Sequence, residues 1–110
     1  MQIQINTDHH IEGHEALVAW ATSEVKTALG RHSGHITRVE VHLSDENGHK
    51  TGQSDKRCVM EARLEGRQPL AVTHHAENLH QAVTGAADKL ARVIESTLGR
   101  AAARTETVAE

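Results

Sequence analysis

The stretch KRCVMEARLEG, residues 56–66, alternates small or apolar side chains with charged ones. Neighbouring residues of a strand point to opposite faces. The residues expected on the apolar face are Cys58, Met60, Ala62 and Leu64. A strand with one apolar and one charged face is typical of an antiparallel sheet that has one side in water. The stretch therefore predicts a strand in a sheet that is covered on one face only.

Three further stretches predict strands of the same sheet. Apolar residues alternate with polar ones over residues 2–6 and 34–45, and a short β-rich run follows at 69–74. Pro69 stands at the start of the last run, which suits an edge strand or the beginning of a strand. Together with 56–66, these stretches predict four strands.

Two longer stretches have helical spacing. Apolar residues recur every three or four positions over residues 14–30 and 79–98. Gly30 and Gly99 are interpreted as the ends of these helices, and Asn78 as the residue that caps the start of the second. The sequence therefore predicts one helix between the first two strands and one after the last strand.

The order β-α-β-β-β-α predicts an α+β fold. We expect a four-stranded, mostly antiparallel sheet with both helices packed on one face, and the first two strands parallel because a helix connects them. Residues 1–100 are expected to form a single domain, and residues 101–110 a flexible C-terminal tail. The open face should carry Arg38, Glu40, His42, Glu61 and Arg63.

Composition narrows the class of protein. Among 110 residues, 15 acidic side chains against 12 Lys and Arg give a net charge of -3, so a nucleic-acid site would have to be a local basic stripe. No run of about 18 apolar residues predicts a membrane span. The first residues do not resemble a secretory signal, and the single Cys58 has no partner for an internal disulfide. We therefore expect a cytoplasmic protein.

Aromatic residues are almost absent. Trp20 is the single aromatic side chain of the Phe, Trp and Tyr types, so the stacking platforms of single-strand binders are not expected. Trp20 lies at the edge of the apolar stripe of the first predicted helix. We interpret it as a residue that packs in the seam between helices.

The stretch from Asp45 to Cys58, DENGHKTGQSDKRC, is long for a hairpin loop. It lacks the regular ligand spacing and the closing glutamate of a calcium loop, and it lacks the glycine-lysine pattern of a phosphate loop. We interpret it as a mobile hairpin loop that brings Lys56 and Arg57 to the start of the third strand.

Ten histidines raise the possibility of a metal site. A zinc site needs three or four converging ligands, but adjacent strand residues such as His74 and His75 point to opposite faces. The pair His9 and His10 has the same limitation. Cys58 falls on the core-facing row, and no serine or cysteine has an evident base partner. We therefore expect no metal, no cofactor and no catalytic residue. Most histidines would be charged near about pH 5.5, which should turn the net charge positive and favour the binding of a polyanion such as nucleic acid.

The second helix predicts a basic flank. At about 100° per residue, with Leu90 facing the core, one side of the helix carries Lys89, Arg92 and Arg100. The same flank also carries the small residues Gly85 and Ser96. Such a row would let a phosphate backbone approach closely, and Arg can donate two hydrogen bonds to one phosphate. The alternative is that this flank is the ordinary solvated side of an amphipathic helix.

These motifs together resemble a known family. The order of elements, the opening MQIQIN, HEALVAW in the first helix and NLHQAVTGAADKLARVI in the last resemble the ribosome hibernation-promoting factor and ribosome-associated inhibitor family, also called sigma-54 modulation or S30EA. The loop that ends in DKRC resembles a short-form branch of that family. The resemblance extends over residues 1 to about 100.

The resemblance implies a function. It implies a domain related in shape to double-stranded RNA-binding domains, which binds 16S rRNA of the small ribosomal subunit and blocks the channel for messenger and transfer RNA. Such a protein is not an enzyme and needs no small-molecule substrate. The family's RNA contacts would fall on Lys89, Arg92, Lys56 and Arg57, with Arg100 and Lys26 as further candidates. Because Lys26 is the only Lys or Arg of the first helix, a protein-interaction module that kept the fold without ribosome binding is the alternative.

Overall fold

The computed structural model describes residues 1–8, 11, 14–46 and 55–109, with side chains described as far as residue 100. Its elements follow the order predicted from the sequence, with one short 3-10 helix added, which confirms the α+β fold. The elements are β1 (Gln2–Thr7), α1 (His14–Leu29), η1 (Gly30–His35), β2 (Ile36–Asp45), β3 (Lys56–Leu64), β4 (Leu70–Ala76) and α2 (Leu79–Ala109).

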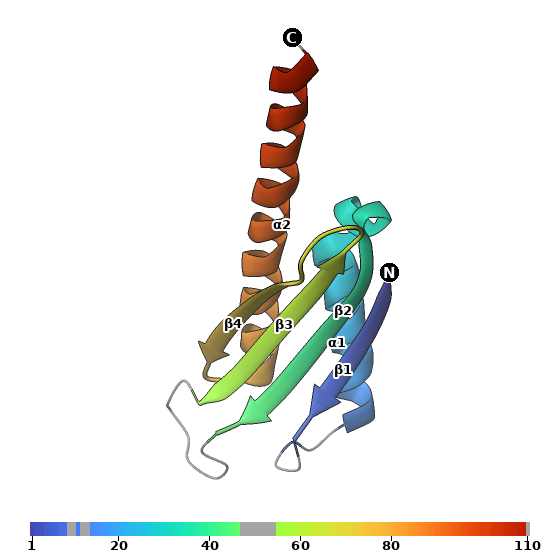
Figure 1. Cartoon of the computed structure of the whole chain (residues 1–110). Coiled ribbons are helices and arrows are strands. Elements are labelled where there is room, and N and C mark those ends of the chain that lie inside the picture. Colours follow the sequence, from blue (N-terminus) through green and yellow to red (C-terminus); the bar gives the residue numbers. More distant parts are fainter. Residues whose placement is uncertain (9–10, 12–13, 47–54, 110) are drawn as a thin grey trace.

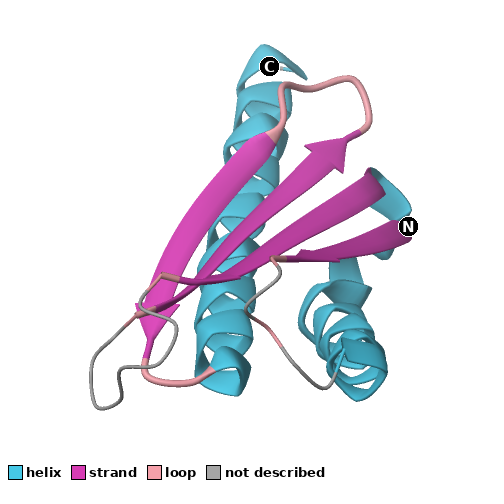
Figure 2. Cartoon of the chain, turned by 90° about the horizontal axis from the view of Figure 1, so that it is seen from below, coloured by secondary structure: helices cyan, strands magenta, loops and turns pink. Residues whose placement is uncertain are grey.

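The four strands form one sheet in the order β1-β2-β3-β4. β1 pairs with β2 in parallel, and the other two pairs are antiparallel. Both α-helices cover the same face of the sheet (Figures 1 and 2). β4 is an edge strand, which agrees with the position of Pro69 just before it.

The core lies between the sheet and the two helices. The alternating row of β3 supplies wholly buried Cys58, Met60 and Ala62, as predicted. The larger of the fully buried apolar residues on the neighbouring elements are Val25, Leu29, Val39, Val41, Val83, Leu90 and Ile94. Burying this apolar surface is the main term that holds the helices to the sheet.

The seam between α1 and α2 contains Trp20. Its ring centroid lies 4.2 Å from that of His80, and the two ring planes are tilted by 58°. Trp20 also packs against the core cluster. The prediction that Trp20 packs between helices is therefore confirmed.

The ends of the helices agree with the sequence at three of four positions. The Asn78 side chain accepts a hydrogen bond from the Gln81 N–H at 2.8 Å, so it caps α2. α1 ends at Leu29, directly before Gly30, where the chain passes into η1. The prediction that α2 ends at Gly99 is wrong, because the helix continues to Ala109 and extends past the sheet (Figure 1).

Two physical reasons explain why α2 passes through Gly99. A glycine inside a helix costs only about 1 kcal/mol relative to alanine, and residues 101–103 are all alanine, the best helix former. Gly66, by contrast, has a φ of 72° and occupies the left-handed conformation that ends regular structure.

No helix of the described chain, α2 included, has the length and apolar character needed to cross a membrane.

Candidate nucleic-acid interface

The structure places three predicted cations on an exposed flank of α2, which we call the α2 basic flank: Lys89, Arg92 and Arg100. The Lys89 ammonium group donates a hydrogen bond to the Thr73 carbonyl of β4 at 3.0 Å. Arg100 donates to the Ser96 hydroxyl at 2.8 Å. From the rise of an α-helix, the α2 basic flank extends over about 16 Å.

Within the described part of the structure, carboxylates do not neutralise the charges of the α2 basic flank. Among the side chains that the structure describes, no carboxylate lies within ion-pair distance of Lys89, Arg92 or Arg100. Lys89 and Arg100 are held by uncharged acceptors, which leave their charge intact. The flank therefore presents three positive charges to a phosphate backbone.

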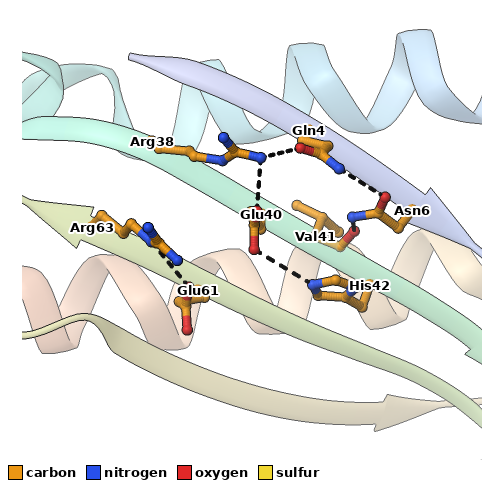
Figure 3. Close-up of polar contacts among 8 residues, drawn as sticks. All are labelled: Gln4, Asn6, Arg38, Glu40, Val41, His42, Glu61 and Arg63. Carbon is orange, nitrogen blue, oxygen red and sulfur yellow. Dashed lines mark hydrogen bonds and ion pairs between the residues drawn. The ribbon is translucent and has the colours of Figure 1, made fainter.

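The open face of the sheet has a different electrostatic character (Figure 3). Arg38 donates to the Gln4 side chain and pairs with Glu40 at 2.8 Å. On the next strand, Arg63 pairs with Glu61 at 3.5 Å. The face is exposed and polar as predicted, but its arginines already have carboxylate partners. It is a weaker site for an anion than the α2 basic flank.

Lys56 does not belong to an open basic surface. Its ammonium group lies 2.9 Å from Asp55 and 3.4 Å from Asp45, and its side chain is 18% exposed. The hydrogen bond from Lys56 is the main cause that lowers the pKa of Asp55, and the same bond raises the pKa of Lys56. Two buried aspartates therefore neutralise this cation at the base of the β2–β3 hairpin.

Arg57 follows Lys56 and lies on the other face of β3. Its Nε is 3.8 Å from the Glu46 carboxylate, which also lies 3.5 Å from the His75 ring. Its side chain is about half exposed. Arg57 is thus more accessible than Lys56 but has an acidic neighbour. The predicted mobile loop lies within residues 45–58, and residues 47–54 of that stretch lie outside the described residues.

Lys26 is exposed but separate from the α2 basic flank. Glu24, two residues earlier in α1, faces α2 and accepts a hydrogen bond from Thr84 at 3.5 Å. Two residues turn an α-helix by about 200°, so Lys26 projects away from α2. The structure therefore does not bring Lys26 together with Lys89 and Arg92.

Gly85 has a packing role that the sequence did not indicate. A methyl group at this position would overlap the imidazole ring of His74 on β4. The absence of a side chain at Gly85 thus lets α2 approach β4 closely. The sequence suggested that Gly85 leaves room for a phosphate. In the structure, the His74 ring occupies the space beside Gly85.

A pocket that sequence reasoning missed opens at the seam of the two helices. It has a volume of about 580 Å³ and mostly apolar walls. Its lining residues are Ala16, Leu17, Trp20, Lys56, Asn78, Leu79 and His80. The position of Trp20 at the edge of its apolar stripe was the available signal, but the opposing residues of α2 could not be paired with it from spacing alone.

The described residues assemble no metal centre, and Cys58 is not an activated nucleophile. No group of three His, Cys, Asp or Glu side chains in the described part of the chain is placed to hold a metal ion. His9 and His10 lie outside the described residues. Cys58 is fully buried, and this burial raises the pKa of its thiol to about 12. A protonated, buried thiol is a poor nucleophile.

Comparisons with known proteins find one matching family and similar folds. The sequence model of the sigma 54 modulation protein / S30EA ribosomal protein family matches residues 3–101. The fold is similar to the N-terminal domain of Protein Y from Thermus thermophilus, with a TM-score of 0.70, 18% identity, and coverage of 88% of this chain and 99% of that chain. It is also similar to a ribosomal subunit interface protein from Coxiella burnetii, with a TM-score of 0.66, 14% identity, and coverage of 90% and 99%. A comparison with curated protein sequences finds no significant match.

Proposed function

Because the chain belongs to the sigma 54 modulation protein / S30EA ribosomal protein family, we propose that it is a ribosome-associated factor that inhibits translation. It binds 16S rRNA of the small subunit and occupies the channel that messenger and transfer RNA use. Inhibition is steric, so the protein contributes shape and charge and carries out no chemical step.

The α2 basic flank is the observation that carries this proposal. Its three cations are exposed and have no carboxylate partner among the described side chains. Contacts to phosphate supply a large share of the affinity of a protein for nucleic acid, and the counterion release behind that affinity requires cations that no carboxylate neutralises. Lys89, Arg92 and Arg100 meet that requirement in a protein with a net charge of -3.

The remaining candidate cations have different parts in the proposal. Arg57 is a secondary contact because Glu46 competes for it. Lys56 stabilises the base of the hairpin and is not assigned an RNA contact. Lys26 projects from the side of α1 that faces away from α2. It would contact RNA only in a channel whose RNA surrounds both helices.

Cosedimentation with purified small subunits over a series of salt concentrations tests the proposal. For about four phosphate contacts, the logarithm of the association constant should fall against the logarithm of the salt concentration with a slope of about -3 to -4. Addition of the protein should also inhibit translation in a purified system. Absence of cosedimentation at every salt concentration would overturn the proposal.

A second candidate function is a protein-interaction module. The pocket of about 580 Å³ between α1 and α2 favours it, because a pocket with mostly apolar walls can receive an anchoring side chain of a protein partner. Affinity capture that returns one defined protein without ribosomal proteins would support this function. Capture of ribosomal proteins and rRNA together would support ribosome association instead.

A further inference from the structure

β4 is an edge strand without a charged side chain. Its sequence, LAVTHHA, contains no Lys, Arg, Asp or Glu, and β3 is its only neighbour among the strands that the structure describes. Free backbone groups on an edge pair readily with another strand, and monomeric proteins normally protect such edges with a charge, a proline or a covering element. What covers the outer side of β4 therefore decides whether it can pair.

Hydrogen bonds along β3 show which residues of β4 face outward. The Glu65 N–H donates to the His35 carbonyl at 3.0 Å, and the Asp55 carbonyl accepts from the Glu46 N–H at 2.9 Å. Both bonds lie on the side of β3 that is next to β2. Because bond directions alternate along a strand, the odd-numbered residues of β3 bond toward β2 and the even-numbered residues toward β4.

Thr73 therefore has outward-facing backbone groups. It lies opposite Val59, an odd-numbered residue of β3, so its N–H and C=O point away from that strand. The same alternation turns the backbone groups of Ala71 and His75 outward. These residues offer the alternating donors and acceptors with which a further antiparallel strand pairs.

Lys89 covers the centre of this edge. Its ammonium group donates to the Thr73 carbonyl at 3.0 Å, and no other described side chain has a hydrogen bond to an outward backbone group of residues 71–75. Val93, one turn further along α2, is 37% exposed, one of the two exposed large apolar residues in the described structure. Among the described side chains, Lys89 is thus the one that is hydrogen-bonded to the centre of this strand edge, and an exposed apolar side chain lies close by on the same helix.

We propose that the outer edge of β4 is an interface for β4 of a second copy of the chain, and that Lys89 holds it closed in the monomer. Antiparallel pairing about Thr73 places Thr73 opposite Thr73 of the second copy, and Ala71 opposite His75. Because the strand contains no Lys, Arg, Asp or Glu, this pairing brings no like charges of these residue types together. The arrangement is two-fold symmetric and closes after two copies.

The second copy is the partner that the geometry favours. A two-fold axis at Thr73 places the two α2 helices side by side, because each packs on its own β4. The two copies of Lys89 then lie near the axis, with Val93 of each copy close by. Lys89 opposes pairing in two ways, since it occupies the Thr73 carbonyl and repels its counterpart. Removing it frees the edge and leaves the apolar contact.

Sedimentation velocity of the purified protein tests this inference without ribosomes, so its outcome is independent of the proposed function. We expect Lys89→Ala to lower the dissociation constant of a dimer by about tenfold or more relative to the native chain. The matched control Lys26→Ala removes an exposed lysine elsewhere and should leave the oligomeric state unchanged. A Lys89→Ala protein that stays as monomeric as the native chain at equal concentration would overturn the inference.

Two further measurements locate the interface. Amide hydrogen exchange at Ala71, Thr73 and His75 should be fast in the monomer and slow in the Lys89→Ala dimer. In the double variant Lys89→Ala/Thr73→Pro, proline removes an outward N–H that β3 does not use, so the protein should return to a monomer. A dimer whose Thr73 amide still exchanges rapidly, or one that persists in the folded double variant, would contradict pairing through β4.

Discussion

The ammonium group of Lys56 lies 2.9 Å from a carboxylate oxygen of Asp55, whose side chain is almost completely buried. The same ammonium group reaches Asp45, which lies directly opposite Lys56 in the register of β2 and β3. One cation therefore pairs with two acidic residues at the base of the β2–β3 hairpin. Lys56, which the family resemblance suggested for RNA binding, thus allows two carboxylates to be buried.

The Lys56–Asp55 pair predicts a dependence of stability on pH. The pKa of Asp55 is lowered in the folded protein, so the unfolded chain binds more protons near its ordinary value of 3.8. The stabilisation is complete above that pKa and is lost as pH falls through the lower folded value. In Lys56→Met, the free energy of unfolding should fall at pH 7 and rise less steeply between about pH 3 and pH 5.

Urea unfolding at each pH, followed by Trp20 fluorescence, measures this effect. Lys26→Met is the matched control, because it makes the same Lys-to-Met substitution at an exposed position. It should keep the native dependence on pH. Equal pH profiles for Lys56→Met and the native chain would show that the ion pair does not couple protonation to folding.

The cap at the start of α2 predicts a loss of stability when it is removed. Asn78→Ala leaves the Gln81 N–H without its side-chain acceptor and should reduce the free energy of unfolding by about 1 kcal/mol. Ser96→Ala, an exposed position further along α2, should change it by less than about 0.5 kcal/mol. Urea denaturation compares the two variants, and equal effects would argue against a cap at Asn78.

The contact of Gly85 with His74 predicts that the effect of Gly85→Ala on stability depends on which residue occupies position 74. Alanine in place of a helical glycine normally stabilises by about 1 kcal/mol. Here the added methyl group overlaps the His74 ring, so Gly85→Ala should destabilise the native chain. In a His74→Ala background the same substitution should be stabilising. A double-mutant cycle in urea measures the change of sign, and a stabilising effect in both backgrounds would contradict the contact.

Burial of Cys58 predicts an unreactive thiol. Because the pKa of the thiol is raised to about 12 and the side chain is fully buried, little thiolate exists at pH 8 and reagents cannot reach it. A chromogenic disulfide reagent should react with Cys58 at the rate of unfolding in native buffer and rapidly in urea. Fast labelling of the folded protein would show that the core beside β3 opens.

The sequence predicted the sheet well because alternation is a local property. The period of two on β3 assigned Met60 to the core and Glu61 to the open face, and no other part of the chain was needed for that assignment.

The end of α2 was not predictable in the same way. Glycine ends a helix where the chain adopts a positive φ, as at Gly66, and the residue type alone does not distinguish that case from Gly99.

The candidate site shows the same division. The α2 basic flank followed from helix geometry, since Lys89 and Arg92 belong to one rigid element. The partners of Lys56 could not be found locally, because Asp45 reaches it from another strand and the pairing register decides the contact. The hydrogen bond from Lys89 to Thr73 likewise depends on how closely α2 packs on β4, which Gly85 permits.

The most direct test of ribosome association compares two double charge reversals in cosedimentation with small subunits. Lys89→Glu/Arg92→Glu reverses the centre of the α2 basic flank. Arg63→Glu/Arg67→Glu makes the same change in net charge at two exposed positions on and beside the open sheet face. The first variant should lose association at moderate salt and, at low salt, show a salt slope smaller by about 2. The second should bind like the native chain. Equal binding by both double variants would contradict the assignment of the RNA contact to α2.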